Sequence, residues 1–374
     1  MYLETYLDTH SDFTIDPNSN GVDWSKPIIE NKRLIIWANN ITTAKTNQST
    51  GLHATVHVGL EDKVLKSQDM LAYDTFNITK SRERLYLANS AHKSASNTLR
   101  EEYSADNIRQ DLDHFCAWLD KNWEVNRYSI QEFDPTATVP PLAFDLHPYL
   151  LKAGGTILFG PPGSGKSWIT MLMATSIANG FRGLWSIEES RPVLFINLER
   201  PSHTLALRDA GMRRAFELPG SSNVHYLHAR GTSLVGIMPK VKTFVAEHPN
   251  AVLFLDSVSR SQSGKLNDDI TANNFVDLMN STQATWCGIG HTPRDDNSHI
   301  YGSVHFEAGE DIGVRVSTLS RTNHGMVLSL EIDKANDMAQ KIGKQYYELM
   351  FDSRGLIEAR EVSSDRLEDL GINE

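Results

Sequence analysis

Residues 160–167 read Gly-Pro-Pro-Gly-Ser-Gly-Lys-Ser, which matches the pattern G-x-x-x-x-G-K-[ST] in full. A short apolar run at 156–159 precedes this segment, and a helix-like pattern follows it from Trp168. The glycines let the backbone turn tightly and aim its N–H groups into a concave anion site. The following helix adds the positive end of its dipole. This strand–loop–helix context predicts a phosphate-binding loop rather than an ordinary glycine-rich turn.

Two residues at the end of this loop have predicted roles in nucleotide chemistry. Lys166 can reach the β- and γ-phosphates and is expected to be catalytic, while the Ser167 hydroxyl can bind Mg²⁺. The sequence therefore predicts ATP and Mg²⁺ as ligands. The expected nucleotide-binding residues are Gly160, Pro161, Pro162, Gly163, Ser164, Gly165, Lys166, Ser167 and Trp168.

The composition is that of an ordinary globular protein, with 40% apolar and 22% charged residues among 374 positions. A chain of this length can form two domains and a sizeable core. It has neither a long apolar run nor a basic stretch followed by an apolar one at its N-terminus. We therefore expect no membrane span, no signal peptide and a cytoplasmic location. Cys116 and Cys287 are far apart in apolar surroundings, which favours core packing over a disulfide.

The charge is distributed unevenly along the chain. A formal net charge of −11 argues against a broad surface that coats nucleic acid. Residues 63–100, however, contain seven Lys or Arg and three acids. That segment is compatible with one basic face, and equally with a solvated sheet edge or helix face.

The chain is expected to have two domains and a linker. Three prolines within 128–142 interrupt any regular element, so this segment is the predicted linker. Residues 1–127 are predicted to form a small α+β domain of unknown role. Its expected strands lie at 33–38, 53–59, 70–76 and 84–88, and its expected helix lies at 106–123.

Residues 143–360 alternate between short apolar runs and helical patterns, which predicts an α/β domain with a mainly parallel, doubly covered sheet. After Gly313 the pattern changes to hairpin-like strands, which predicts an antiparallel C-terminal extension of that sheet. Residues 361–374 are predicted to be an acidic tail. The expected strands are 156–159, 193–197, 225–228, 252–255 and 286–289, then 314–319, 327–331 and 345–350; the expected helices are 167–178, 205–216, 235–247 and 270–282.

Two carboxylates follow buried strands of this domain. Asp256 ends the apolar run 252–255, where it can hold a Mg²⁺-bound water beside Ser167, although an aspartate after a strand can also cap a turn. The next residue is Ser257, whereas AAA+ ATPases have a glutamate there that polarises the attacking water. Glu199, which follows the strand 193–197, is therefore the predicted catalytic base. The alternative for Glu199 is an exposed loop residue.

A further polar residue is His291, which follows the apolar strand 286–289 in the segment Gly288-Ile-Gly-His-Thr-Pro-Arg294. It could hydrogen-bond the γ-phosphate and report the loss of that group to the following loop. The alternative is a structural histidine.

The set and order of these motifs resemble the RecA-like P-loop ATPases, and most of all the branch of RepA-type hexameric replicative helicases. KaiC- and DnaB-type proteins are similar at a greater distance. The residues that carry the resemblance are 160–167, Glu199 with Arg208, Asp256-Ser257, 291–294, Gly302-Ser303 and Lys334-Ala-Asn336. The resemblance covers about residues 143–352 and implies a RecA-like P-loop NTPase core.

The resemblance also implies a homo-oligomer, expected to be a hexamer, in which a neighbouring subunit inserts a basic residue at the nucleotide. Arg315, Arg321 and Lys334 are the candidates for this finger in trans, and a structural salt bridge is the alternative for each. DnaB-like proteins often have an arginine two positions after the lysine, where this chain has Asn336. The identity of the finger therefore stays open.

In the same family, loops after the Mg²⁺ aspartate and after the histidine strand bind single-stranded DNA. The matching segments are 260–273 and 294–302, with Arg260, Lys265, Arg294 and His299 as candidate DNA contacts. Both segments also contain acidic pairs, Asp268-Asp269 and Asp295-Asp296, and each could simply be a solvated loop.

The sequence thus predicts an oligomeric, ATP-hydrolysing motor that acts on DNA in replication or recombination. Two alternatives remain. One is a recombinase or loader that forms filaments on single strands, and the other is a nucleotide-gated regulatory or protein-binding ATPase that does not act on DNA. A small-molecule kinase has the least support, because no acceptor-site pattern or arginine-rich lid is visible.

Overall fold

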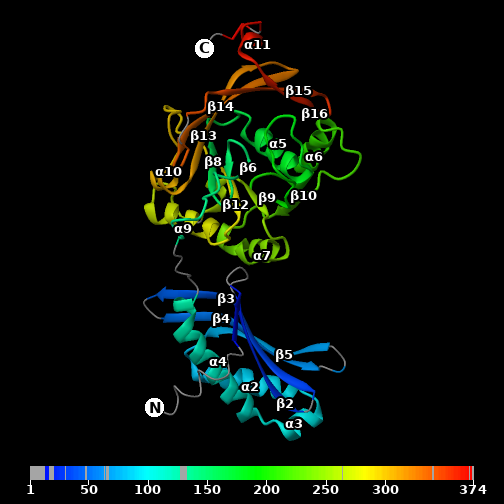
Figure 1. Cartoon of the computed structure of the whole chain (residues 1–374), viewed down its shortest axis with the longest axis vertical. Helices are drawn as coiled ribbons and strands as arrows, with labels where there is room; N and C mark the ends of the chain where they lie inside the picture. The colour runs from blue at the N-terminus through cyan, green and yellow to red at the C-terminus, as the bar shows by residue number, and fades with distance from the viewer. Residues whose placement is uncertain are drawn as a thin grey trace. The chain divides into compact units, whose positions relative to one another are not determined.

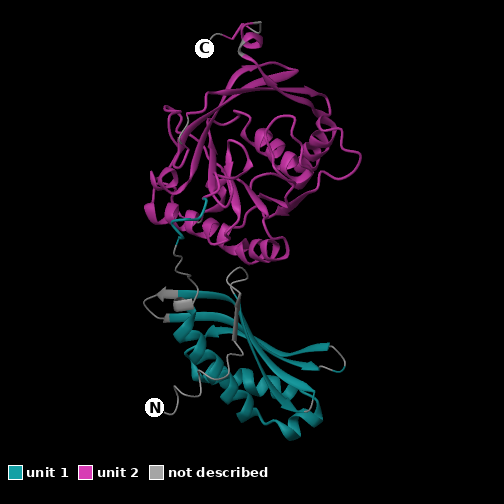
Figure 2. Ribbon diagram, in the orientation of Figure 1, with its two compact units in different colours: residues 1–138 teal, residues 139–374 magenta. Residues whose placement is uncertain are grey.

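The computed structural model describes residues 13–16, 21–29, 31–46, 49–62, 64, 67–126, 133–262, 264–338, 341–369 and 371–372. The chain divides into two compact units, residues 1–138 and 139–374, each with its own hydrophobic core (Figure 2). The division falls within the segment predicted as a linker, of which 128–132 lie outside the described residues. Lys63 and Lys66 of the basic segment also lie outside them.

The N-terminal unit combines an antiparallel sheet with helices that follow it in the chain (Figure 1). Its strands, in spatial order, are β1 (Phe13–Asp16), β2 (Gly21–Ile29), β3 (Lys32–Thr46), β4 (Ser49–Asp62) and β5 (Ser67–Asn77). Its helices are α2 (Ser81–Ser94), α3 (Asn97–Glu102) and α4 (Ala105–Asn126). Alternate residues of β3 and β4 are buried and share one core with the helices. The predicted helix at 106–123 and the first three predicted strands are confirmed.

The prediction of a strand at 84–88 is wrong, because these residues lie within α2. The run is too short for its period to distinguish a strand from a helix. Leu87, Ala88 and Ala91 are buried, whereas Leu85 and Tyr86 are 36% and 56% exposed. Buried residues three and four positions apart form one face of a helix, and this face packs in the core of the unit.

The C-terminal unit is built on a nine-stranded sheet in the order β10-β9-β11-β12-β8-β13-β14-β15-β16 (Figure 1). The first five of these in space, with β13, run parallel: β8 (Gly155–Phe159), β9 (Val193–Asn197), β10 (Val224–His228), β11 (Val252–Asp256), β12 (Thr285–Ile289) and β13 (Ile312–Arg321). The antiparallel strands are β14 (Gly325–Ala335), β15 (Gln345–Asp352) and β16 (Gly355–Val362). The predicted parallel sheet with an antiparallel extension is confirmed.

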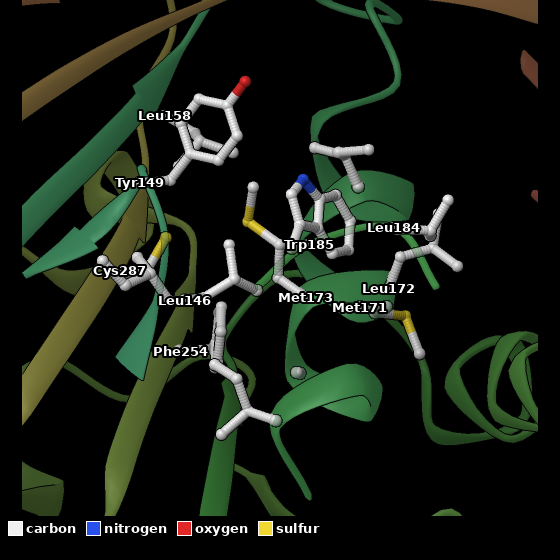
Figure 3. Packing of buried hydrophobic residues seen from close by; sticks show 14 of the residues in the cluster. Leu146, Tyr149, Leu158, Met171, Leu172, Met173, Leu184, Trp185, Phe254 and Cys287 are labelled. Carbon is white, nitrogen blue, oxygen red and sulfur yellow. The ribbon is translucent and has the colours of Figure 1, made fainter. Parts of the chain in front are cut away.

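Helices cover the parallel strands on both faces. Residues of β9 alternate between two cores, with Val193 and Phe195 in one and Leu194 and Ile196 in the other. The first core, part of which Figure 3 shows, contains α5 (Lys166–Asn179) and α6 (Ser202–Ala215). The second contains α7 (Leu234–Glu247) and α9 (Asp269–Asn280). The remaining elements are β6 (Phe144–Leu146), β7 (Leu150–Leu151), α8 (Val258–Ser261), α10 (His305–Gly309) and α11 (Ser364–Asp369).

The segment predicted as an acidic tail from residue 361 begins inside a strand. Val362 is the last residue of β16, and Leu367 of α11 is 3% exposed. Both side chains pack with Val327 and Tyr346 in a small hydrophobic cluster. Acidic residues indicate a solvated surface here, but the spaced apolar residues between them hold α11 against the sheet.

Two expectations from composition can be compared with the structure. Cys116 and Cys287 are free thiols that are 2% and 0% exposed, which confirms core packing. Among the described residues, none of the helices is both long and apolar enough to cross a membrane.

The close packing of β8 against β12 gives a test of the fold. A Cβ atom at Gly155 would lie 2.1 Å from Cζ2 of Trp286, its partner across the strand pair. We expect Gly155→Ala to destabilise the C-terminal unit by about 1–3 kcal/mol, because the buried indole must move. The midpoint of urea unfolding measures this effect. Gly220→Ala, which has no atom within 4 Å of its Cβ, is the matched control. Equal midpoints for the two variants would contradict the packing of β8 on β12.

Candidate functional site

The predicted phosphate-binding loop connects β8 to α5 at the carboxyl edge of the parallel strands, where ligands bind in open α/β sheets. Gly165 has a φ of +87°, and a Cβ there would meet Leu328 at 2.9 Å. A Cβ on Gly160 would lie 2.3 Å from the carbonyl oxygen of Val316 on β13. The loop is therefore pressed against β13 and β14, and only glycine fits at these two positions.

Lys166 points back into the loop that precedes it. Its Nζ donates to the carbonyl oxygens of Gly160 at 2.7 Å and Pro161 at 2.8 Å. The residue is 5% exposed, and burial lowers the pKa of the ammonium to about 8, against the opposing effect of Asp256 and Glu199. The loop thus holds a buried positive charge, which a bound anion would stabilise in its charged form.

Asp256 ends β11 and is 3% exposed. Burial, and then the nearby Glu199, raise the pKa of its carboxyl, whereas a hydrogen bond from Ser167 and two arginines lower it. One of these is Arg200, whose Nε lies 3.7 Å from Asp256 Oδ2 and whose Nη2 donates to Ser167 Oγ at 3.3 Å. A buried carboxylate bonded to a hydroxyl offers the hard oxygen ligands that Mg²⁺ prefers, and a cationic group already lies beside them. Ser167 and Asp256 therefore fit a Mg²⁺ site.

Glu199 lies in the loop between β9 and α6, next to Asp256. The Ser257 hydroxyl, which takes the position of the missing glutamate, donates to Glu199 Oε2 at 3.1 Å and lies 3.1 Å from Ser259 Oγ. Strands β9 and β11 are neighbours, and their register sets Asp256 opposite Asn197. Glu199 follows Asn197 by two residues, so its carboxylate emerges beside that of Asp256. Ser257 thus fixes the orientation of Glu199.

The turn that carries Glu199 is held by Asn197, a fully buried residue at the end of β9. The Asn197 Oδ1 accepts from the backbone N–H of Arg200 at 3.0 Å, and its Nδ2 donates to the Arg200 carbonyl oxygen at 2.7 Å. These two bonds fix the backbone on both sides of Arg200 and, with it, the direction of Glu199. No motif in the sequence indicated Asn197, whose only signal was an amide at the end of an apolar strand.

His291 follows β12 and is partly buried beside the same cleft. Burial, and then the charge of Lys166, lower the pKa of its imidazole. Its Nδ1 is buried and makes no hydrogen bond with the described residues. A neutral ring with one unused nitrogen at this place can bond to a group that enters the cleft.

These side chains line one cleft of about 190 Å³. It brings together the loop residues 162–167 with Glu199, Asp256 and His291, whereas Gly160 and Pro161, also predicted to bind nucleotide, do not line it. Trp168 also lines it, and the Arg208 guanidinium stacks on the Trp168 ring at 4.5 Å. Burial, and then the charge of Arg200, lower the pKa of Arg208 to about 10. Arg208 was among the residues that carry the resemblance, whereas Arg200, Ile289 and Met326 line the cleft without any prediction from the sequence.

The three candidate finger residues lie at different places in the antiparallel extension. Arg315 is paired with Asp333 across β13 and β14. Lys334 donates to the carbonyl oxygens of Glu307 at 2.5 Å and Glu310 at 2.6 Å, at the end of α10. Arg321 lines the cleft and donates to the Gly163 carbonyl oxygen of its own chain at 3.3 Å. Each side chain thus has contacts within the chain.

The two candidate DNA segments are joined through Ser303, the residue that directly follows the second segment. Ser303 donates from its backbone N–H to the Leu266 carbonyl oxygen at 2.9 Å and from its hydroxyl to Asp269 Oδ1 at 2.6 Å. The four candidate contacts, Arg260, Lys265, Arg294 and His299, are all exposed. Residue 263 of the first segment lies outside the described residues. Arg260 also lines a second cleft that shares Glu199 with the first.

The fold and the cleft define the class of this protein: it contains a P-loop ATPase domain of RecA-like fold. The sequence profile of a family described as AAA domain matches residues 125–297, which include Lys166, Glu199, Asp256 and His291. No curated protein matches the chain.

Solved structures were also compared with the chain. One solved ATPase domain has 13% identity and a TM-score of 0.41, over 55% of this chain and 85% of its own. A KaiC-like protein from the hyperthermophilic archaeon Pyrococcus horikoshii has 12% identity and a TM-score of 0.41, over 59% of this chain and 94% of its own.

The two bonds of Asn197 lead to a prediction about turnover. We expect Asn197→Ala to lower the rate of ATP hydrolysis about tenfold or more, because Glu199 is the predicted base and a small displacement of it would misalign the attacking water. Affinity for ADP should stay within about twofold, since the loop and Lys166 are not touched. Steady-state kinetics and calorimetric titration measure the two effects.

Asn179→Ala is the matched control for this variant. Asn179 lies at the end of α5, away from the cleft, and donates to the carbonyl oxygens of Thr175 and Ser222 at 2.8 and 2.7 Å. Its Oδ1 also accepts from Asn223 Nδ2 at 2.8 Å, and Asn197 also contacts His228 Nδ1 at 3.1 Å, so each variant loses three side-chain hydrogen bonds. Equal losses of turnover in both variants would show that Asn197 acts only through stability.

Proposed function

We propose that this protein is an oligomeric, ATP-hydrolysing motor that acts on DNA, with a helicase-like role in replication or recombination. The observation that carries the proposal is that Glu199 and Asp256 emerge from neighbouring strands at the phosphate-binding loop. The hydroxyl of Ser257 orients Glu199 from the position where AAA+ proteins have their glutamate. This arrangement supports the RecA-like helicase branch over the AAA+ one.

The proposed hydrolysis is direct. Glu199 orients and partly deprotonates a water for in-line attack on the γ-phosphate. Lys166 stabilises the negative charge that spreads over the phosphate oxygens in the transition state. His291, neutral in the cleft, donates a hydrogen bond to the γ-phosphate. Bound Mg²⁺, held by Ser167 and Asp256, would supply further positive charge at the phosphates.

The site is proposed to lie at a subunit interface, where a basic residue of a neighbouring copy completes it. Arg315, Arg321 and Lys334 stay the candidates. The two contacts of Lys334 with the end of α10 favour a structural role for it, and the position of Arg321 at its own loop favours a role in cis. Arg315, with its single described partner Asp333 and a side chain that is 29% exposed, is the candidate we favour.

Single-stranded DNA is the proposed partner of the joined segments 260–273 and 294–302. Three of their four acids have local roles that reduce their repulsion of phosphate. Asp268 caps α9 through Thr271, Asp269 binds Ser303, and Asp296 lies 3.2 Å from His299 Nδ1. The exposed cations Arg260, Lys265 and Arg294 can then contact the strand.

A second candidate function is a nucleotide-gated regulatory or protein-binding ATPase. The net charge of −11 favours it, because a strongly acidic chain repels nucleic acid at long range. The response of ATPase activity to single-stranded DNA distinguishes the two functions. A filament-forming recombinase or loader would share that response and would differ in strand displacement.

The assignment of the catalytic residues gives the next prediction. We expect Lys166→Ala to lose nucleotide binding and turnover. Glu199→Gln should lower turnover about 10²-fold or more and still bind ATP, because only the base is removed. Phosphate release and ATP binding by calorimetry measure the two effects. Glu247→Gln, an exposed glutamate at the end of α7, is the control. Full hydrolysis by Glu199→Gln would remove Glu199 from the mechanism.

The proposed DNA surface is tested by the rate of ATP hydrolysis with and without single-stranded DNA. We expect stimulation at low salt, and an increase in mass to an oligomer with a non-hydrolysable ATP analogue. Replacing Arg260, Lys265 and Arg294 by Ala should remove the stimulation. The variant should also show a weaker salt dependence of DNA binding. The slope of log K against log[salt] should become smaller by about 0.7 for each phosphate that the variant no longer neutralises. Arg354→Ala, at a side chain that is 75% exposed, is the control. A rate of ATP hydrolysis that does not change when single-stranded DNA is added would favour the regulatory function.

A further inference from the structure

Arg200 lies on both residues that fit the Mg²⁺ site. Its Nη2 donates to Ser167 Oγ at 3.3 Å, and its Nε lies 3.7 Å from Asp256 Oδ2. We propose that the Arg200 guanidinium occupies the cation position of the cleft and competes with Mg²⁺ for it. The proposal depends on the proposed function in one respect, which is that Mg²⁺ enters the site together with a nucleotide. It concerns a residue to which the proposed hydrolysis gives no role.

The reason for a cation at this position is the pair of carboxylates. Asp256 is 3% exposed and Glu199 is its neighbour, so two carboxylates meet where one of them is almost fully buried. A buried charge without a counter-ion is strongly unfavourable. An arginine next to the pair compensates it in the absence of metal, and Arg200 directly follows Glu199 in the chain.

The other cations of the cleft act on the carboxylates from a greater distance and make their direct contacts elsewhere. Lys166 Nζ is bonded to the carbonyl oxygens of its own loop, and the Arg208 guanidinium stacks on Trp168. Arg321 donates to the carbonyl oxygen of Gly163. Among the described cationic side chains, Arg200 is the one that contacts both Ser167 and Asp256.

The contacts of Arg200 are long enough to be exchanged. Its Nε is buried and finds no hydrogen-bond partner within the described part of the chain, so it interacts with Asp256 by charge alone. Its backbone is fixed by Asn197, but its side chain is 31% exposed and lines the cleft. The guanidinium can therefore move away without a change in the turn that carries Glu199.

Mg²⁺ needs close oxygen ligands in octahedral geometry, at about 2.0–2.1 Å. A metal ion held by the Ser167 hydroxyl, and through a water by Asp256, cannot share this space with the Arg200 guanidinium. Binding must therefore displace Arg200, and the displacement lowers the apparent affinity for the metal. In the displaced position Arg200 still lies in the phosphate cleft and can neutralise nucleotide charge.

The test replaces Arg200 and measures metal binding directly. Mn²⁺ is the probe, because its free concentration can be followed by electron paramagnetic resonance, and each protein is titrated with and without ADP. We expect Arg200→Ala to bind Mn²⁺ about threefold more tightly or better than the natural protein, because a partly buried ion pair no longer competes. Arg200→Lys, a shorter cation, should lie between them.

Two further variants locate the effect. Asp256→Asn should remove the gain when it is combined with Arg200→Ala, which places the Mn²⁺ at this carboxylate. Arg213→Ala removes an arginine of α6 that pairs with Asp209 at 3.1 Å and does not line the cleft, so its Mn²⁺ midpoint should not change. Melting temperatures without metal show whether each variant is folded, and we expect Arg200→Ala to melt lower than Arg200→Lys.

An unchanged or weaker Mn²⁺ midpoint in Arg200→Ala, with and without ADP, would overturn the proposal. A gain that survives Asp256→Asn would overturn it as well, because the metal would then lie elsewhere. If the natural protein bound no ADP, the proposed ATPase function would fail, and the titrations without nucleotide would still decide the role of Arg200.

Discussion

The candidate site depends on one buried charge, the carboxylate of Asp256. At 3% exposure this group is costly to ionise, and the nearby Glu199 makes it more so. The fold compensates with a hydrogen bond from Ser167 and with Arg200 and Arg208. The Ser167 hydroxyl and the two arginines are therefore held in place by the charge of the Asp256 carboxylate. The groups of a chemically demanding site are thus organised by the fold itself.

The parallel sheet brings these groups together. β9 and β11 are neighbours, and their register sets Asn197 opposite Asp256. Glu199, two residues past Asn197, then lies beside Asp256 although the two are far apart in the chain. Ser257 completes the arrangement, because a hydroxyl at this position can orient a glutamate that comes from the next strand. A glutamate at 257 would instead place a third negative charge in the same small space.

The sequence predicted the fold of the C-terminal unit well, because its strands and helices are strongly periodic and in an order that permits few topologies. It also predicted which residues would meet at the cleft, since the ends of parallel strands share one edge. The strand predicted at 84–88 was wrong, because five residues do not fix a period. Asn197 and Arg200 escaped prediction for another reason. Their roles depend on hydrogen bonds and charges between strands, and no pattern within one segment records them.

The finger in trans could not be chosen from the sequence, and the charges of the cleft suggest why several basic residues look equivalent. Lys166, Arg200, Arg208 and Arg321 all line it from the same chain, against Glu199 and Asp256. The cations supplied in cis therefore outnumber the carboxylates and can bind an anionic ligand in its ground state. In the proposed oligomer, a cation from a neighbouring copy would add little to that binding. Its contribution would come in the transition state, where charge accumulates on the transferred group. The residue that fills this role is thus defined by where it reaches when two copies meet, and not by the number of basic residues near the loop.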